Sequence, residues 1–149
     1  MVEKFPDCRI LAIDKDAESQ RYASDFEIDF RGRFQFHKMC FSAMAQLEAQ
    51  KPDVVLFDLG TSTTQLRSTC RGFSFRGEDE LDMRLDRSSD QIRAIDVVNQ
   101  MSEAKLEWIL REYGEECFSS KIARTIVRAR ERKVISTGIE LAQLVLRVK

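Results

Sequence analysis

Short apolar runs that end in a carboxylate are the first regular feature of this chain. Residues 9–13 form one run and are followed by Asp14, and residues 53–58 form another that closes on Asp58. Between them, residues 34–36 alternate as Phe-Gln-Phe. Apolar runs of this length are typical of strands in a parallel sheet that is covered on both faces. The pattern predicts three strands, two of which end in an acid.

Two helical segments separate these predicted strands. Asp16 stands where an N-cap would precede a helix over residues 17–26, because its side chain can accept hydrogen bonds from free N–H groups. Residues 42–50 have helical spacing, and the ring of Pro52 disfavours helix at the residue before it. The alternation predicts an α/β fold with a parallel sheet, whose ligands lie beyond the carboxyl ends of the strands.

From about residue 94 the apolar spacing becomes that of helices. The apolar stripes of two successive helices are formed by Leu106, Ile109, Leu110 and Tyr113, and then by Phe118, Ile122, Ile126 and Val127. Gly114 follows the first stripe and can take the left-handed conformation that closes a helix. Thr137 and Glu140 have the spacing of a capping box and predict a last helix.

The composition indicates the class of protein. The chain has 149 residues, of which 43% are hydrophobic and 33% charged, enough for one domain with a core and a small helical appendage. It has no apolar run of about 18 residues and no signal-peptide pattern, so we expect an intracellular protein. The cysteines lie far apart without a CxxC pair, and His37 is the only histidine, so we expect reduced thiols and no metal site. The cysteines are Cys8, Cys40, Cys70 and Cys117.

The charge of the chain is unevenly distributed. Residues 119–149 contain eight lysines and arginines against two glutamates, a net charge of +6, whereas the preceding residues carry a net charge of −7. Lys121, Arg124 and Arg128 fall on one face of the predicted helix. A basic end on an acidic body indicates either a contact with a polyanion or a solvated helix face, and charge alone does not choose between them.

The stretch over residues 54–86 is the least periodic part of the chain. Glycines, aromatic residues and charges are interleaved in it without helical or strand period, which is typical of a loop shaped around a ligand. In the predicted fold, Asp14 and Asp58 lie at the carboxyl ends of two strands, where a ligand is expected. From its spacing alone, Asp14 either accepts hydrogen bonds from ribose hydroxyls or caps the turn into the next helix.

The first 60 residues also resemble the start of a response-regulator receiver domain. In that family an early acidic pair binds magnesium and a later aspartate, here Asp58, is phosphorylated. A receiver domain would continue with further strand-helix units. Residues 60–65 instead read Gly-Thr-Ser-Thr-Thr-Gln and lead into helices, so we treat a receiver-type signalling domain as an outsider.

The continuation resembles the ribosomal-RNA small-subunit (cytosine-N4-)-methyltransferase family of bacteria and mitochondria. The motifs, in order, are DLGTS at residues 58–62, QL at 65–66, RGFSF at 71–75, LDMRLD at 81–86, and YGEE at 113–116 with IARTIV at 122–127. The resemblance runs from about residue 9 to residue 145. One such motif is weak evidence, but their order and spacing are specific.

This resemblance implies a partial Rossmann-like methyltransferase core over residues 1–65 and a helical substrate-recognition insertion over residues 66–149. It implies S-adenosylmethionine as cofactor, the N4 amine of a cytidine in small-subunit ribosomal RNA as substrate, and a cytoplasmic or mitochondrial-matrix location. The Gly-rich loop of the family would lie before Met1, and its last strands would follow Lys149. The alternative is therefore a non-catalytic RNA-binding or ribosome-assembly remnant. A homodimer, or pairing with a missing segment, would restore the sheet.

The resemblance also assigns roles to single residues. Asp14 matches the ribose-binding acid, Phe41 an aromatic residue beside the adenine, and Gln65 a further cofactor contact. Asp58 matches the acid beside the methyl donor, where its carboxylate can accept a hydrogen bond from cytosine N4. Phe41 as a core residue and Gln65 as a surface turn residue remain alternatives. RNA contacts by stacking or through phosphate are expected from Arg71, Phe73, Phe75, Arg84, Lys121, Arg124 and Arg128.

Overall fold

The chain folds as two units in the computed structural model, which describes residues 2–47, 51–67, 71–75 and 78–148. Unit 1 comprises Met1–Asp58 and Leu85–Ser89, and unit 2 comprises Leu59–Arg84 and Asp90–Lys149. Unit 1 is α/β and unit 2 is mainly helical. The predicted α/β class, a parallel sheet followed by a helical part, is confirmed, although the sheet of the described residues has two strands instead of three.

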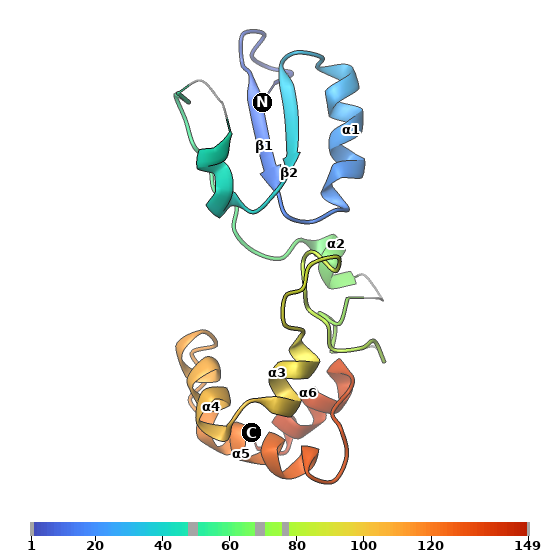
Figure 1. Cartoon of the computed structure of the whole chain (residues 1–149), viewed down its shortest axis with the longest axis vertical. Coiled ribbons are helices and arrows are strands. Elements are labelled where there is room, and N and C mark those ends of the chain that lie inside the picture. The colour runs from blue at the N-terminus through green and yellow to red at the C-terminus, as the bar shows by residue number, and fades with distance from the viewer. Residues whose placement is uncertain (1, 48–50, 68–70, 76–77, 149) are drawn as a thin grey trace. The chain divides into compact units, whose positions relative to one another are not determined.

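The sheet of unit 1 pairs β1 (Ile10–Asp14) with β2 (Phe34–Lys38) in parallel. Its register places Ile10 opposite Phe34 and Asp14 opposite Lys38, so both strands end at the same edge. Helix α1 (Ser19–Asp29) connects them and lies beside β2 (Figure 1). This is the predicted strand-helix-strand order.

Helix α1 starts two residues later than predicted and ends three residues later. Its N-cap position is Glu18 and not Asp16. Asp16 still stabilises the start of the helix, because its Oδ1 accepts a hydrogen bond from the Glu18 N–H at 2.9 Å. Phe26 of α1 packs against the sheet, with its ring centroid 5.6 Å from that of Phe34.

The two edges of this sheet differ. On the outer edge of β2, the N–H of Phe36 donates to Glu27 Oε1 at 2.9 Å, so a side chain of α1 occupies that edge. On β1, the parallel register directs the backbone groups of Leu11 and Ile13 away from β2. Within the described residues these groups have no hydrogen-bond partner, so the free edge of the sheet is that of β1.

The strand predicted over residues 53–58 is wrong. This segment forms no ladder, and Val54 and Leu56 are 81% and 78% exposed. The helix predicted over residues 42–50 is also different, because Phe41–Gln46 form a short 3-10 helix, η1, and residues 48–50 lie outside the described part. An apolar run indicates a strand only where a neighbouring strand completes its hydrogen bonds.

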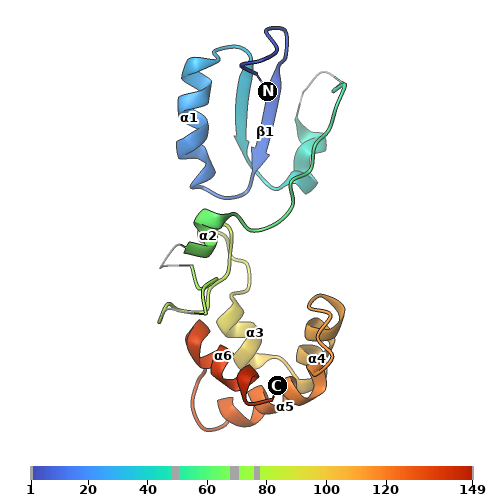
Figure 2. The same cartoon turned by 180° about the vertical axis from the view of Figure 1, so that it is seen from behind.

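Unit 2 consists of five helices among its described residues. They are α2 (Thr63–Arg67), α3 (Ala94–Gln100), α4 (Glu103–Glu112), α5 (Ser119–Arg130) and α6 (Gly138–Leu146). Helices α4 and α5 pack along each other, as both views of the ribbon show (Figures 1 and 2). Leu106 of α4 and Ile122 and Ile126 of α5 lie in the core together with Leu81 from the preceding loop.

The helix ends follow the sequence in part. The capping box predicted at α6 is confirmed, since Thr137 Oγ1 accepts from the Glu140 N–H and the Glu140 carboxylate accepts from the Thr137 N–H. At the end of α4 the left-handed residue is Glu115, with φ of 49°, and not Gly114. Gly114 is needed for another reason, because a Cβ there would lie 2.7 Å from the Leu110 carbonyl oxygen.

No helix in the described part of the chain is long and apolar enough to cross a membrane. Cys8, Cys40 and Cys117 are free thiols, and Cys70 lies outside the described residues.

Candidate functional site

Asp14 ends β1 at the edge where both strands of unit 1 finish. Its Oδ1 accepts a hydrogen bond from the Asp16 N–H at 2.8 Å, and its Oδ2 accepts one from Ser19 Oγ at 2.6 Å. The carboxylate therefore holds the turn into α1. Each carboxylate oxygen has two lone pairs, so both oxygens keep an acceptor position. The capping and the ribose-binding interpretations of Asp14 are compatible with each other.

Phe41 begins η1, which follows β2 after Met39 and Cys40, and is 49% exposed, so it is not a core residue. Its ring packs edge-on against Phe57, with the centroids 6.0 Å apart and the planes at 78°. Phe57 is itself 50% exposed. The two rings thus form an open aromatic pair that could contact the flat face of a nucleobase. The contact also fixes the residue before Asp58 beside η1.

Asp58 is exposed and has no hydrogen-bond or ion-pair partner among the described residues. The segment that leads to it forms no ladder with the described strands, so no strand pairing fixes the direction of its carboxylate. The convergence of Asp14 and Asp58 on one small molecule therefore stays a prediction.

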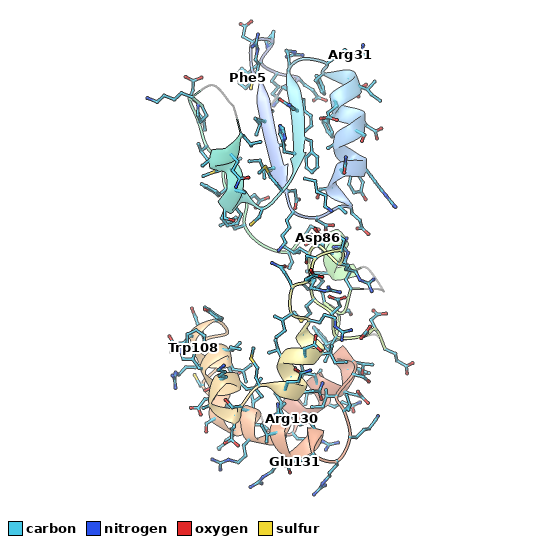
Figure 3. The ribbon with its side chains drawn as sticks, in the orientation of Figure 1. Phe5, Arg31, Asp86, Trp108, Arg130 and Glu131 are labelled. Carbon is cyan, nitrogen blue, oxygen red and sulfur yellow. The ribbon has the colours of Figure 1, made fainter. Side chains whose placement is uncertain are left out.

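A charged pair that the sequence did not predict lies in the same unit. Lys38, at the end of β2, places its Nζ 3.4 Å from Asp86 Oδ2. The pKa of Asp86 is lowered, mainly because the Ser88 hydroxyl and N–H donate to its Oδ1 at 2.6 and 3.0 Å, with Lys38 adding to the effect. Figure 3 labels Asp86, which closes the LDMRLD motif. The hydrogen bonds from Ser88 to Asp86 form a turn, whose signal in the sequence is the Asp-x-Ser spacing.

An open hollow of about 290 Å³ lies between α1 and the sheet. Its lining includes Asp14 and Ser19, but most of it is aromatic and aliphatic, from Tyr22, Phe26 and Phe34 among others. Ribose hydroxyls need polar partners, and this surface offers few. We therefore assign the hollow to the packing of α1 and not to a cofactor.

Gln65 lies in unit 2 and is 7% exposed. Its Oε1 accepts a hydrogen bond from the Ser62 N–H at 2.8 Å, while its own N–H donates to Ser62 Oγ at 3.2 Å. This reciprocal pair is a capping box that starts α2. The Ser-x-x-Gln spacing is visible in the sequence and could have predicted it. Gln65 is therefore a buried helix-capping residue and not the surface turn residue of the alternative.

Two of the arginines predicted to bind RNA are held inside the loop before α3. Arg84 pairs with the buried Asp82, with its Nε 2.7 Å from Oδ1 and its Nη2 2.9 Å from Oδ2. Arg71 is 6% exposed. Removal of one partner of such a pair would destabilise the loop, because the other charge would stay buried without its partner. Their geometry gives both arginines a role in shaping the loop.

The loop itself is tightly folded onto the helices. Gly72 has φ of 72°, and a Cβ there would lie 2.2 Å from the Glu80 carbonyl oxygen. Leu81 joins the core, and its N–H donates to the Ser136 carbonyl oxygen at 2.9 Å. Met83 has φ of 59°, a conformation that costs about 1–3 kcal/mol for a residue other than glycine.

The aromatic residues predicted to stack on RNA differ in exposure. Phe73 is partly buried, whereas Phe75 is 65% exposed. Only Phe75 therefore offers most of its ring to a partner in the described structure.

The cations predicted on α5 share one face of that helix, as expected. Lys121, Arg124 and Arg128 are all exposed. The Lys121 ammonium lies 5.5 Å from the centroid of the Phe118 ring, and Arg124 Nε lies 3.4 Å from Glu103 Oε1. Surface pairs of this kind are weak, so an anion could compete for these groups.

Comparison with known proteins identifies the relatives of this chain. The family model described as "MraW methylase family" matches residues 1–149. The "Ribosomal RNA small subunit methyltransferase H" of Persephonella marina is 41% identical over 152 residues, which cover 99% of this chain and 51% of the relative. The protein of the same name from Neorickettsia sennetsu is 44% identical over 140 residues, covering 93% of this chain and 47% of the relative. The chain thus spans about half the length of the curated relatives it matches.

Proposed function

Because the chain belongs to the MraW methylase family, we propose that it serves the S-adenosylmethionine-dependent methylation of the N4 amine of a cytidine in small-subunit ribosomal RNA. The match over residues 1–149 carries this proposal, together with relatives named as ribosomal RNA small-subunit methyltransferases. The family match over residues 1–149 speaks against the receiver-type alternative. The domain roles proposed are a methyltransferase core over residues 1–65 and a substrate-recognition part over residues 66–149.

Three of the four proposed cofactor contacts, Asp14, Phe41 and Asp58, belong to unit 1. Asp14 suits the nucleoside part of the cofactor, since its two oxygens keep one acceptor position each for a pair of ribose hydroxyls. Phe41 supplies an exposed ring for the adenine. The buried capping role of Gln65 leaves its amide little freedom, so we give it the weaker place among the four proposed contacts. The bound cofactor supplies an electrophilic methyl group on a sulfonium.

Asp58 is the proposed catalytic residue. The lone pair of the cytosine N4 amine is delocalised into the ring, so the amine is a poor nucleophile until an acceptor aligns its hydrogens. The exposed Asp58 carboxylate has its lone pairs available to accept from N4. In the transfer, the N4–C bond would form as the S–CH3 bond of the sulfonium breaks, S-adenosylhomocysteine would leave, and one amine proton would pass to water. Much of the rate then comes from holding donor and acceptor in line.

The RNA contacts belong to unit 2 in this proposal. Lys121, Arg124 and Arg128 contact phosphates from α5, and Phe75 offers a ring to an unstacked base. Phe73, Arg71 and Arg84 support this surface from inside the loop, since they are partly or fully buried.

A methyl-transfer assay tests the proposed function. The chain is incubated with small ribosomal subunits and S-adenosylmethionine that carries a radioactive methyl group, and N4-methylcytidine is quantified after nuclease digestion. We expect incorporation by the native chain and a loss of at least about a hundredfold in Asp58→Ala, as for other groups that orient a reactant. Equal incorporation by both proteins would contradict the role of Asp58, and none by the native chain would contradict catalysis by it.

The second candidate is a non-catalytic RNA-binding or ribosome-assembly protein of the same family. The exposed cations of α5 favour it, because they need no cofactor to bind phosphate. RNA affinity that is the same with and without S-adenosylhomocysteine, with no methyl transfer, would select this candidate.

We also propose that unit 1 associates with a second copy through the free edge of β1. The exposed apolar segment that contains Val54 and Leu56 lies in the same unit and forms no ladder with the described strands. Free edges and extended apolar segments pair readily.

The proposed location is that of the ribosomal RNA substrate, which is the cytoplasm or the mitochondrial matrix.

A further inference from the structure

One exposed side chain of unit 2 stands in a backbone conformation that its residue type disfavours. Met83 has φ of 59°, in the left-handed region, and is 47% exposed. Glycine or asparagine takes this conformation at lower cost, because a longer side chain brings its Cβ close to the following carbonyl oxygen. A methionine is therefore a costly choice for a bend alone.

Both neighbours of Met83 impose this bend. Asp82 is 2% exposed and forms the bidentate pair with Arg84, while the Met83 N–H donates to the Arg71 carbonyl oxygen at 2.9 Å. The Leu81 side chain is buried in the core two residues earlier. The chain is thus pinned on each side of Met83.

The side chain that this bend presents lies outside the core of the described part of unit 2. Leu81 and Asp82 point inward, whereas Met83 is not among the side chains that pack against the core in the described part of unit 2. Strained residues that are held by their surroundings cluster at binding sites, and here the strain is an observed outlier. The result is a half-exposed thioether on a loop that is held on both sides.

We infer that Met83 contacts an unpaired base of the RNA and contributes to the recognition of a single-stranded nucleotide. This rests on the proposed function. A thioether is polarisable and packs favourably against the face or edge of an aromatic ring. An enzyme that modifies a base must receive it outside the stack, where such a contact becomes available. In duplex RNA the bases stay stacked, so their faces are not available to the Met83 side chain.

The test measures fluorescence anisotropy of two labelled RNAs on the full chain. One is a hairpin whose loop contains unpaired cytidines, and the other is a blunt duplex with the same number of phosphates. The variants are Met83→Asn and Met83→Gly, which both tolerate the left-handed conformation and are therefore expected to fold. We expect a loss of hairpin affinity of about fivefold in each variant, and no change for the duplex.

Glu115→Asn is the matched control. Glu115 is the other non-glycine residue of the described chain in the left-handed region, with φ of 49°, and it is exposed. It lies outside the loop, so its replacement should leave the preference for hairpin over duplex unchanged. Native-like hairpin affinity in both Met83 variants overturns the inference but not the proposed function. A native chain that binds neither RNA contradicts the RNA-binding part of the proposed function and the inference with it.

Discussion

Single atoms decide several features of unit 2. Gly72 is the clearest case, because a Cβ at this position would meet the Glu80 carbonyl oxygen at 2.2 Å and the Asp82 nitrogen at 2.7 Å. Both obstacles belong to the backbone, which cannot move aside as a flexible side chain can. The same residue has φ of 72°, so steric and conformational costs coincide at one position.

Gly72→Ala should therefore lower the free energy of unfolding of unit 2 by about 2–4 kcal/mol. Trp108, the one tryptophan of the chain, lies in α4 and reports on this unit in a urea titration (Figure 3). Gly32→Ala is the control, since Gly32 has φ of 76° but open space around it and belongs to unit 1. It should leave the Trp108 transition in place. Equal effects of both changes on that transition would contradict the steric argument.

Glu140 links the stability of unit 2 to pH. Its pKa is lowered from 4.5 to about 2, first because Lys133 Nζ donates to its Oε1 at 2.5 Å and then because Ser136 donates to Oε2. A lowered pKa in the folded state stabilises that state above the unfolded pKa, and the contribution is lost as the pH falls through the folded pKa. The stabilisation should decrease between about pH 5 and pH 2.

Glu140→Gln should remove this pH dependence. The amide cannot ionise, and at neutral pH the variant should unfold at a lower urea concentration, with a loss of about 1 kcal/mol for the weakened cap of α6. Urea titrations at a series of pH values from 7 to 2 measure the difference between the two proteins. The account predicts that the curves approach each other toward the acid end. Parallel curves would show that Glu140 is not the linked group.

At the scale of elements, sequence patterns predicted helices better than strands. The capping box of α6 and the stripe of α5 depend on residues within one helix, so periodicity and spacing are sufficient to predict them. The segment that ends at Asp58 depends on a neighbouring strand, which no pattern within residues 53–58 can supply. The same difference between local and distant contacts applies to the candidate site. The turn at Asp14 is local and was one of the two interpretations that its spacing allowed, whereas the pair of Lys38 and Asp86 joins distant residues and was not predicted.

Helix α5 is the element whose charges can be tested as a group. Lys121→Ala and Arg128→Ala should each weaken RNA binding and lower the slope of log affinity against log salt by about 1, because each cation that contacts a phosphate releases a counterion. Arg111→Ala is the matched control, since Arg111 lies on α4 and is paired with Glu107 and Glu112. Filter binding over a range of salt concentrations gives the slopes. Equal slopes in the native protein and the α5 variants would place phosphate contacts elsewhere.

At the scale of the whole molecule, the apolar surface of unit 1 is open. Val54 and Leu56 are 81% and 78% exposed. Soluble monomers rarely expose neighbouring large apolar side chains in this way, and such surfaces mark contacts with other chains. The free edge of β1 lies in the same unit.

The double variant Val54→Lys with Leu56→Lys should therefore reduce self-association. Sedimentation velocity at several protein concentrations measures it, and we expect the native chain to show dimers that the double variant lacks at the same concentration. Leu146→Lys is the control, because Leu146 is 73% exposed on α6 and belongs to unit 2, whereas the sheet belongs to unit 1. A native chain that stays monomeric, or a double variant that still dimerises, would contradict this interface.

The central claim is that the strand-end acid of unit 1 binds the nucleoside of the methyl donor. Calorimetric titration of the full chain with S-adenosylhomocysteine tests it directly, using Asp14→Ala and the control Ser19→Ala, which removes the hydroxyl that donates to Asp14 but keeps the carboxylate. The account predicts saturable binding by the native chain and by Ser19→Ala, and at least about a tenfold loss in Asp14→Ala, as expected for two charge-assisted hydrogen bonds. Equal affinity in all three proteins, or no binding by the native chain, would contradict it.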